Sequence, residues 1–275
     1  MHPALATPEL AQLICEKLQE PEPVCREGTL ASLAVTCRAL REPALDALWR
    51  TQRGIQNIIK CLPSHLWELR EGLNTDPELE WHMTLREIKK GWPSLHIIGT
   101  IQPGDWTVPL SYSRRIKTLF ISPFPAQIQV PDVTVFEAIA STLPTPLFFP
   151  KLRSLHCRTD EGLLPYMNLF LGTRMEFVHL DIAGDDFNDP VPSGLALQSL
   201  KRLHARGLFR LDGPTGSVLL CRPACDLIKQ LDQIEDLSVP NVDREALERL
   251  ARFTSLKALD LEYARPEFLE PAADG

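Results

Sequence analysis

The chain has 275 residues, of which 44% are hydrophobic and 24% charged, which is ordinary for a globular protein of one or two domains. The net charge of −7 disfavours a nucleic-acid partner. No run of about 18 apolar residues and no basic-then-apolar N-terminus is present, so neither a membrane partner nor a secretory signal is expected. Seven cysteines without a regular framework indicate reduced thiols, so we expect a cytoplasmic or nuclear protein.

Residues 8–50 have the periodicity of three short amphipathic helices. The first is predicted to begin at Pro8, because proline suits the first helical position and Thr7 is a suitable N-cap. Apolar residues at spacings of three and four then run from Leu10 to Leu18. Helical units of this size bury little of their own apolar surface, so the segment is expected to dock on a partner.

Proline also sets the predicted limits of the other two helices. The second should follow Gly28 and end at Pro43, which would open a third helix that reaches Trp49. The side chains expected inside the unit are Leu13, Leu30, Ala34 and Leu48.

The residue identities in this segment resemble an F-box domain. The shared elements are the Pro8-Glu9-Leu10 start with a leucine-rich first helix, the Val35-Thr-Cys37-Arg segment and the closing Trp49. The resemblance implies binding to a Skp-family adaptor, which bridges to cullin and RING subunits of a ubiquitin ligase. By matching position, it assigns adaptor contacts to Pro8, Leu10, Ile14, Leu18, Leu33, Val35, Cys37, Leu40 and Trp49.

Two helices are predicted between residue 51 and residue 91. Isoleucines at 55, 58 and 59 indicate a helix that ends at Pro63, and a second helix should run from Asp76 to the Lys89-Lys90-Gly91 stop signal. Their apolar faces favour a rigid helical bridge.

A short cassette of the form apolar-x-x-Leu-x-apolar recurs through the rest of the chain. Steps between its central leucines are 24, 36, 25, 23, 34 and 22 residues. Helical patterns lie between copies, over 133–143, 161–171, 223–231 and 243–253, the last with an aspartate N-cap. The cassettes are 92–97, 116–121, 152–157, 177–182, 200–205, 234–239 and 256–261.

The alternation of strand and helix at this period resembles leucine-rich repeats, in a degenerate form that lacks the usual asparagine or cysteine at the turn. The resemblance implies an irregular solenoid with a parallel sheet. A generic α/β domain with short leucine-rich strands is the alternative. The predicted domains are an F-box domain over 1–50, a helical bridge over 51–91, a leucine-rich-repeat-like domain over 92–265 and a disordered tail over 266–275.

If the cassette leucines point into the core, the alternate residues line the other face of the sheet. Aligning the leucines places His179 beside Ser154 and Arg202, and Asp181 beside His156. The centre of this face is basic, and we expect it to receive an acidic or phosphorylated segment of a target protein. A solvated face without function is the alternative. The predicted target site comprises His156, Arg158, His179, Arg202, His204 and Arg206.

No motif for nucleotide binding, zinc-dependent proteolysis or a hydrolase nucleophile is present. The cassette histidines follow the repeat spacing and should not converge on a metal ion. No catalytic residue, metal or cofactor is therefore predicted, and an enzyme is not expected. The two resemblances together imply the substrate-recognition subunit of a Skp–cullin–F-box ubiquitin ligase. The alternative is a non-ligase leucine-rich-repeat scaffold whose N-terminal helices cap the repeats.

Overall fold

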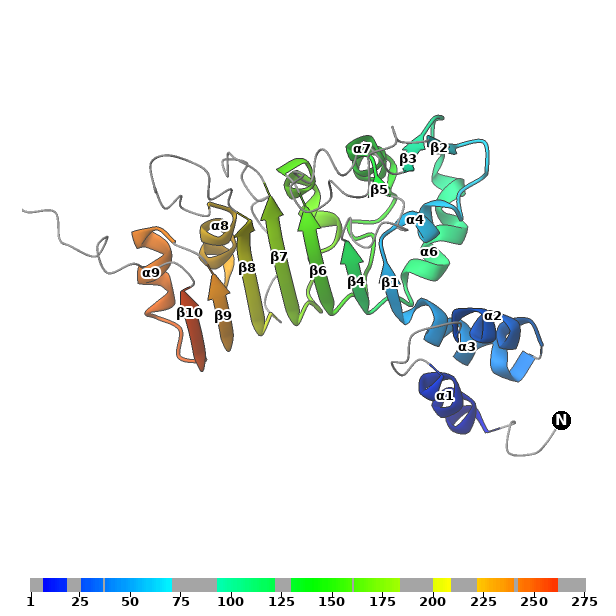
Figure 1. The fold of residues 1–275 in the computed structure, drawn as a ribbon, viewed down its shortest axis with the longest axis horizontal. Coiled ribbons are helices and arrows are strands. Elements are labelled where there is room, and N and C mark those ends of the chain that lie inside the picture. The colour runs from blue at the N-terminus through cyan, green and yellow to red at the C-terminus, as the bar shows by residue number, and fades with distance from the viewer. Residues whose placement is uncertain are drawn as a thin grey trace, which may run out of the picture.

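The computed structural model describes residues 7–18, 26–36, 38–70, 93–121, 130–159, 161–183, 200–208, 222–239 and 242–261. The chain is a mixed α/β protein, in which a seven-stranded parallel sheet is accompanied by a separate three-stranded sheet (Figure 1). This confirms the predicted α/β class and the predicted parallel sheet. Within the ranges given above, no helix is long and apolar enough to cross a membrane.

Three helices form an N-terminal unit at one end of the large sheet (Figure 1). Helices α1 (Pro8–Lys17) and α2 (Arg26–Thr36) both pack on α3 (Arg38–Arg50). The helix boundary predicted at Pro43 is wrong, because Pro43 lies inside α3. A proline there removes one backbone hydrogen bond from the helix, and the helix nevertheless continues, with Leu40, Ala44 and Ala47 buried on either side of Pro43.

The seven parallel strands lie side by side in chain order (Figure 1). Six of the seven predicted cassettes thus supply neighbouring strands of one sheet. The strands are β1 (Thr51–Arg53), β4 (Thr118–Ile121), β6 (Ser154–Thr159), β7 (Phe177–Ala183), β8 (Arg202–Leu208), β9 (Asp236–Val239) and β10 (Ala258–Leu261).

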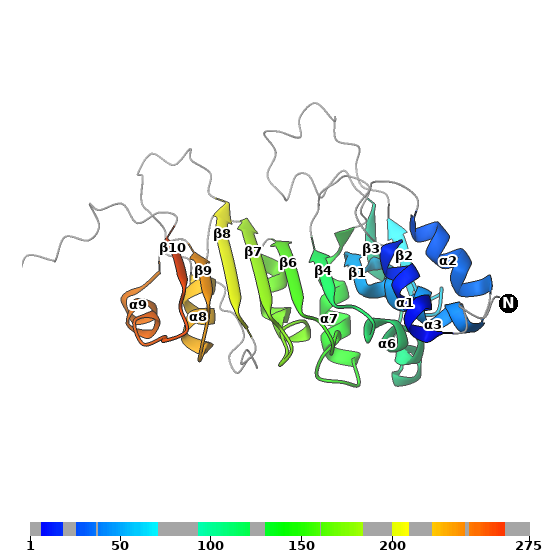
Figure 2. The ribbon, with the colours of Figure 1, turned by 90° about the horizontal axis from the view of Figure 1, so that it is seen from below.

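Helices cover one face of this sheet, and the inward side chains form the main core. Helices between successive strands gather on the same side (Figure 2). They are α6 (Thr107–Ser113), α7 (Val133–Thr142), the 3-10 helix η4 (Glu161–Leu169), α8 (Arg222–Gln230) and α9 (Arg244–Leu250). The four predicted inter-cassette helices are thus present, the second as a 3-10 helix. The strand residues fully buried beneath them include Leu119, Leu155, Val178, Leu203 and Leu237.

A row of charged residues stands where the strands begin. The N–H of each residue donates to the carbonyl oxygen of the previous one in the row, at nitrogen–oxygen distances of 2.8–3.0 Å. This continuous backbone chain fixes the register of all seven strands. We call it the rim row, and it consists of Arg50, Lys117, Arg153, Glu176, Lys201, Glu235 and Lys257.

The rim row shows that the predicted alignment of cassette 177–182 is wrong by two residues. Leu155 pairs with Val178, and not with Leu180 as expected. In the structure, the cassette that supplies β7 begins at the buried Met175 and not at Phe177. This follows because Glu176 is the residue that lies in the rim row. The two faces of the strand are nevertheless as predicted, because a shift of two residues preserves side-chain direction.

The first cassette does not belong to the large sheet. Strand β3 (Ser94–Ile97) pairs antiparallel with β2 (Trp67–Arg70) and parallel with β5 (Val130–Pro131), and these form the small sheet. The end position of the large sheet is occupied by β1, within the segment predicted as a helical bridge. That bridge is therefore only partly helical over 51–70, where α4 (Gln56–Ile59) is followed by β2, and its second predicted helix lies outside the described residues.

Strand β1 differs from the others at the position of the buried leucine. Gln52 pairs with Leu119, and its amide donates to the Leu48 carbonyl at 3.0 Å and accepts from Asn57 at 3.1 Å. These bonds satisfy a side chain that is otherwise buried. Gly54 then turns the chain with φ of +91°, a conformation that favours glycine.

The short 3-10 helix η3 (Pro103–Trp106) directly precedes α6 in the chain.

Candidate functional site

The interior of the N-terminal helical unit is packed mainly with small side chains. Most of the buried residues in its own hydrophobic cluster are small, and the helices can approach closely as a result. Because small residues occupy the contact faces, the larger leucines of the first helix are left on the other side. The small residues of this interior are Ala11, Cys15, Ala34, Ala44 and Ala47.

Three large apolar side chains of α1 therefore face solvent. Leu10, Leu13 and Ile14 are 43%, 50% and 42% exposed, and their spacing places them on one side of the helix. We call these three residues the α1 stripe. Leu13 was expected inside the unit, and that expectation is wrong because Ala11 and Cys15 make the contact with α3. The small residues Ala11 and Cys15, one helical turn apart, were the sequence signal for this arrangement.

The other predicted adaptor residues are divided between surface and interior. Pro8 is exposed, and Val35 on α2 is 86% exposed. Leu18 and Leu33 are half-buried against the small-residue interior. Leu40 is buried within the unit, so it is not available as a surface contact. Cys37 lies outside the described residues.

Trp49 faces the main body of the protein and not the surface of the helical unit. Its ring stacks on Tyr112 of α6 with centroids 4.5 Å apart. Nearby, the Arg115 guanidinium binds Asp46 and lies 2.6 Å from the Glu42 carboxylate, both on α3. These contacts fix the orientation of the helical unit relative to the sheet.

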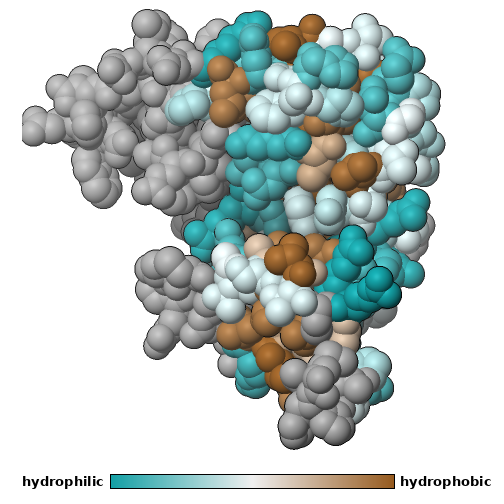
Figure 3. All heavy atoms as spheres, turned by 90° about the vertical axis from the view of Figure 1, so that its right-hand side faces the viewer, coloured by the Kyte–Doolittle hydropathy of each residue, from teal (hydrophilic) through white to brown (hydrophobic). Residues whose placement is uncertain are grey.

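Figure 3 views the molecule from this end and shows hydrophobic side chains among the polar surface of the described N-terminal elements. The α1 stripe is the part of that surface contributed by adjacent turns of one helix. A row of three large apolar side chains on an outer helix is suited to lie in the groove of a partner protein.

On the face of the sheet opposite the helices, aromatic and imidazole rings form a continuous stack. His156, His179 and His204 are register partners on β6, β7 and β8. Their ring centroids are 6.0 Å and 6.3 Å apart, and Phe120 stacks on His156 at 4.4 Å. We call these four residues the ring ladder. The corrected register, and not the predicted one, brings the three histidines together.

A second aromatic centre lies beside the ring ladder. Phe177 contacts His156 at 4.9 Å and His204 at 5.4 Å between centroids, and the Arg202 guanidinium lies 5.4 Å above its ring. The imidazole of His204 also lies 3.5 Å from the Asp236 carboxylate. Phe177 was missed by the sequence analysis because the shifted alignment assigned its position to His179.

The remaining predicted target residues are Arg158 and Arg206, which extend the same face. The register places Asp181 between them, so the backbone positions alternate in charge across β6, β7 and β8. The predicted basic centre is therefore interrupted by an acidic position, and Asp181 does not lie beside His156. The side chains of these three residues lie outside the described part of the structure.

Burial affects the protonation of the ring ladder. Desolvation lowers the pKa of His156 below its ordinary value of 6.5, and the positive charge of a protonated His179 would add to that effect. His156 therefore stays neutral near pH 7 and can stack and accept a hydrogen bond. Its Nε2 lies 3.2 Å from the Ser154 hydroxyl. Among the described side chains, no group of three or more histidine, cysteine or acidic residues is arranged to hold a metal ion.

Comparison with known proteins adds no family assignment. No protein-family model matches the chain, and no curated protein sequence matches it.

Proposed function

We propose that this protein is the substrate-recognition subunit of a Skp–cullin–F-box ubiquitin ligase. In this proposal α1–α3 are the F-box domain, and the seven-stranded sheet with its helices is a degenerate leucine-rich-repeat domain. The α1 stripe binds the Skp-family adaptor, which connects to cullin and RING subunits. The face that carries the ring ladder binds the target protein.

The α1 stripe is the observation that carries the proposal. Its three side chains are about half exposed, although the same helix contains small residues that are fully buried. Burying the remaining surface would contribute about 1 kcal/mol for each side chain, since full burial of a leucine or isoleucine contributes roughly 1.5–3 kcal/mol. The same family resemblance also assigns adaptor contacts to Leu18, Leu33 and Val35, which are exposed or half-buried on the helical unit.

The proposed leucine-rich repeats are supported by the parallel strands and by the shared rim row. The five strands from β4 to β9 each bury a central leucine or valine beneath the helices, as repeat units do when they bury a face only against their neighbours. The face opposite the helices presents Phe120, Phe177 and three imidazoles. Aromatic side chains of this kind are common in protein-binding surfaces.

The contacts of Trp49 and Arg115 also bear on a ligase role. They hold the helical unit against the repeat region at a fixed orientation. In a ligase, such rigidity would keep a bound target at a defined distance from the ubiquitin donor.

Adaptor capture tests the proposal. Leu10→Glu together with Ile14→Glu would place two carboxylates in the proposed interface, where an unpaired charge is strongly unfavourable. We expect the affinity for a Skp-family adaptor to fall at least about 100-fold, which corresponds to roughly 2.7 kcal/mol. The affinity is measured by calorimetry with the purified full chain.

The matched control is Val108→Glu together with Leu247→Glu, which changes two similarly exposed apolar residues on α6 and α9. This control should bind the adaptor as the wild type does. Equal binding by wild type and the Leu10/Ile14 variant, or no binding by the wild type, would contradict the proposal.

A non-ligase repeat scaffold is the second candidate, and the stacking of Trp49 on Tyr112 favours it. In that case the helical unit caps the end of the sheet and binds no adaptor. The wild-type chain would then fail to bind the adaptor, and Trp49→Ala would lower its melting temperature.

A further inference from the structure

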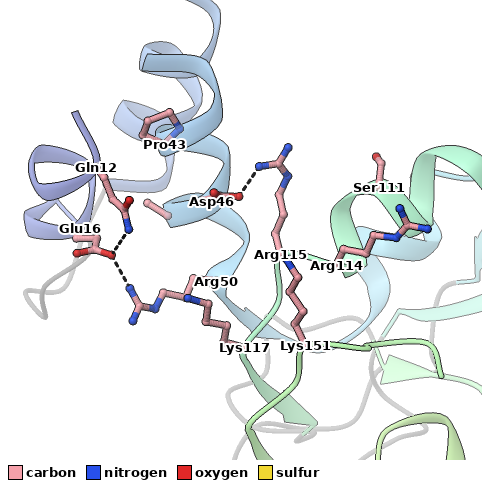
Figure 4. A pocket seen from close by; sticks show the side chains of 11 residues that line it. Gln12, Glu16, Pro43, Asp46, Arg50, Ser111, Arg114, Arg115, Lys117 and Lys151 are labelled. Atoms are coloured by element: carbon pink, nitrogen blue, oxygen red, sulfur yellow. Dashed lines mark hydrogen bonds and ion pairs between the residues drawn. The ribbon is translucent and has the colours of Figure 1, made fainter. Parts of the chain in front are cut away.

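We propose that a pocket between the helical unit and the start of the sheet binds a small, multiply charged phosphate compound. The pocket encloses about 420 Å³, within the range of roughly 300–1,000 Å³ that is usual for small-molecule sites. Its walls come from α1, from α3, from the end of α6 and from the residues that precede β4 and β6 (Figure 4). The site is separate from the α1 stripe and from the ring ladder.

The charges that line this pocket are unbalanced. Its two carboxylates, Glu16 and Asp46, face five cationic side chains. Both carboxylates are already engaged. Glu16 accepts hydrogen bonds from Gln12 at 3.1 Å and Arg50 at 3.0 Å, and Asp46 accepts one from Arg115. The hydrogen bond from Gln12 and the charges of Arg50 and Lys117 lower the pKa of Glu16, so it is ionised, and it accepts both hydrogen bonds through Oε1.

Three other cations line the pocket. The side-chain nitrogens of Arg114, Lys117 and Lys151 make no hydrogen bond or ion pair with any residue within the described ranges. In Figure 4, Lys117 and Lys151 approach from the sheet side, and Arg114 lies on the side of α6. A local excess of positive charge in a chain of net charge −7 attracts anions.

The rim row explains why the excess arises at this end of the sheet. From Arg153 onward the signs alternate, and the Lys257 ammonium lies 2.7 Å from the Glu235 carboxylate. At the start of the row, Arg50, Lys117 and Arg153 follow one another without a carboxylate between them. Arg50 is paired with Glu16 of α1 and Arg153 with Glu176 of the row, which leaves Lys117 as the rim cation at this end without a side-chain hydrogen bond or ion pair to a described residue.

The mixture of lysine and arginine indicates the chemistry of the ligand. Lysine binds phosphate oxygens as a point charge, and arginine binds them through paired N–H donors. The Ser111 side chain also lines the pocket, and its hydroxyl donates to the Val108 carbonyl at 2.7 Å. Three cations from two separate connections, one before β4 and one before β6, favour an anion with several charged oxygens over a single carboxylate.

Calorimetric titration with tripolyphosphate tests the proposal on the full chain. We expect saturable binding with one site per chain, weakening as salt is raised. Lys117→Gln together with Lys151→Gln should weaken binding at least tenfold. Lys151→Gln alone should weaken tripolyphosphate binding several-fold. Lys151 is exposed and has no side-chain hydrogen bond or ion pair among the described residues, so this change should leave the sheet intact.

The matched control is Lys201→Gln together with Lys257→Gln, which removes two rim-row charges far along the sheet and leaves the net charge equal to that of the pocket variant. This control should bind tripolyphosphate as the wild type does. No saturable binding by the wild type, or equal weakening by both double variants, would overturn the proposal. Adaptor capture by the pocket variant should be unchanged, so this test and that of the ligase role can fail independently.

Discussion

His156 stands in the middle of the ring ladder, between Phe120 and His179. Its lowered pKa gives a defined direction to the pH dependence of stability. The unfolded chain takes up a proton near pH 6.5, whereas folded His156 resists protonation until a lower pH is reached. The contribution of this residue to the free energy of unfolding is therefore present above pH 6.5 and is lost as the pH falls through the lowered pKa.

Replacing this imidazole with a ring that cannot be protonated should reduce the pH dependence. We expect His156→Phe to lose less free energy of unfolding than the wild type between about pH 7.5 and about pH 5. Urea unfolding at a series of pH values measures the difference. Ser154→Ala is the control, because it removes the 3.2 Å contact with Nε2 and keeps the imidazole. A steeper loss in His156→Phe would show that the direction is wrong.

At the scale of the elements, the register of β7 determines which side chains form the ring ladder. His179 pairs with His204 in the structure, whereas aligning the leucines would pair Asp181 with His204. Adjacent strands are about 4.8 Å apart, within the Cα range of about 4.4–6.8 Å that a disulfide spans. Residues offset by two positions on adjacent strands are roughly 8 Å apart, which is too far.

Engineered cysteine pairs distinguish these two registers. His179→Cys with His204→Cys should form a disulfide rapidly under mild oxidation, and Asp181→Cys with His204→Cys should not. Mass spectrometry of non-reduced tryptic peptides identifies the link and separates it from any link to the native cysteines. Cross-linking of the Asp181 pair alone would support the leucine-aligned register and contradict the one described here.

The same element shows how far the sequence can predict this structure. The cassettes identify six strands of the large sheet, because a buried leucine in a short apolar strand is a strong signal. They misplace β7, since Val178 occupies the position where the other cassettes have leucine and Phe177 resembles the start of a cassette. The charged rim residue was the better marker, but its role depends on backbone bonds between strands.

Strand β1 and the exposure of Leu13 could not be predicted for a related reason. Strand β1 spans three residues and has Gln52 at the position where the other strands have leucine or valine, so only its pairing with β4 identifies it. Leu13 and Ala11 are both compatible with an inward face of α1. The choice between them depends on the small residues of α3, which are visible as a contact surface only after the helices have packed.

At the scale of the whole molecule, most of the buried hydrophobic residues that the structure describes fall into two clusters. One belongs to the helical unit and includes Leu30, and the other runs through the sheet and includes Leu203. No residue is buried in both clusters among those described. The two parts are connected by surface and partly buried contacts, such as the one between Trp49 and Tyr112.

Truncation of each core should therefore have a local effect. Leu30→Ala and Leu203→Ala should each cost about 2–5 kcal/mol in the part that contains them. Hydrogen exchange followed by mass spectrometry should show lost protection within 8–50 for Leu30→Ala, and within β6–β9 for Leu203→Ala. Loss of protection throughout the chain in both variants would mean that the two clusters unfold as one unit.

The hydrogen-bonded amide of Gln52 sets a limit on how a sheet of this kind can lengthen. Gln52 already pairs with the buried Leu119 of β4, so a central leucine can lie beside this amide. A further strand beyond β1 would gain less apolar contact there than a strand inserted between β4 and β9, where the central residues are leucine or valine, because the bonds of the amide are committed to Leu48 and Asn57.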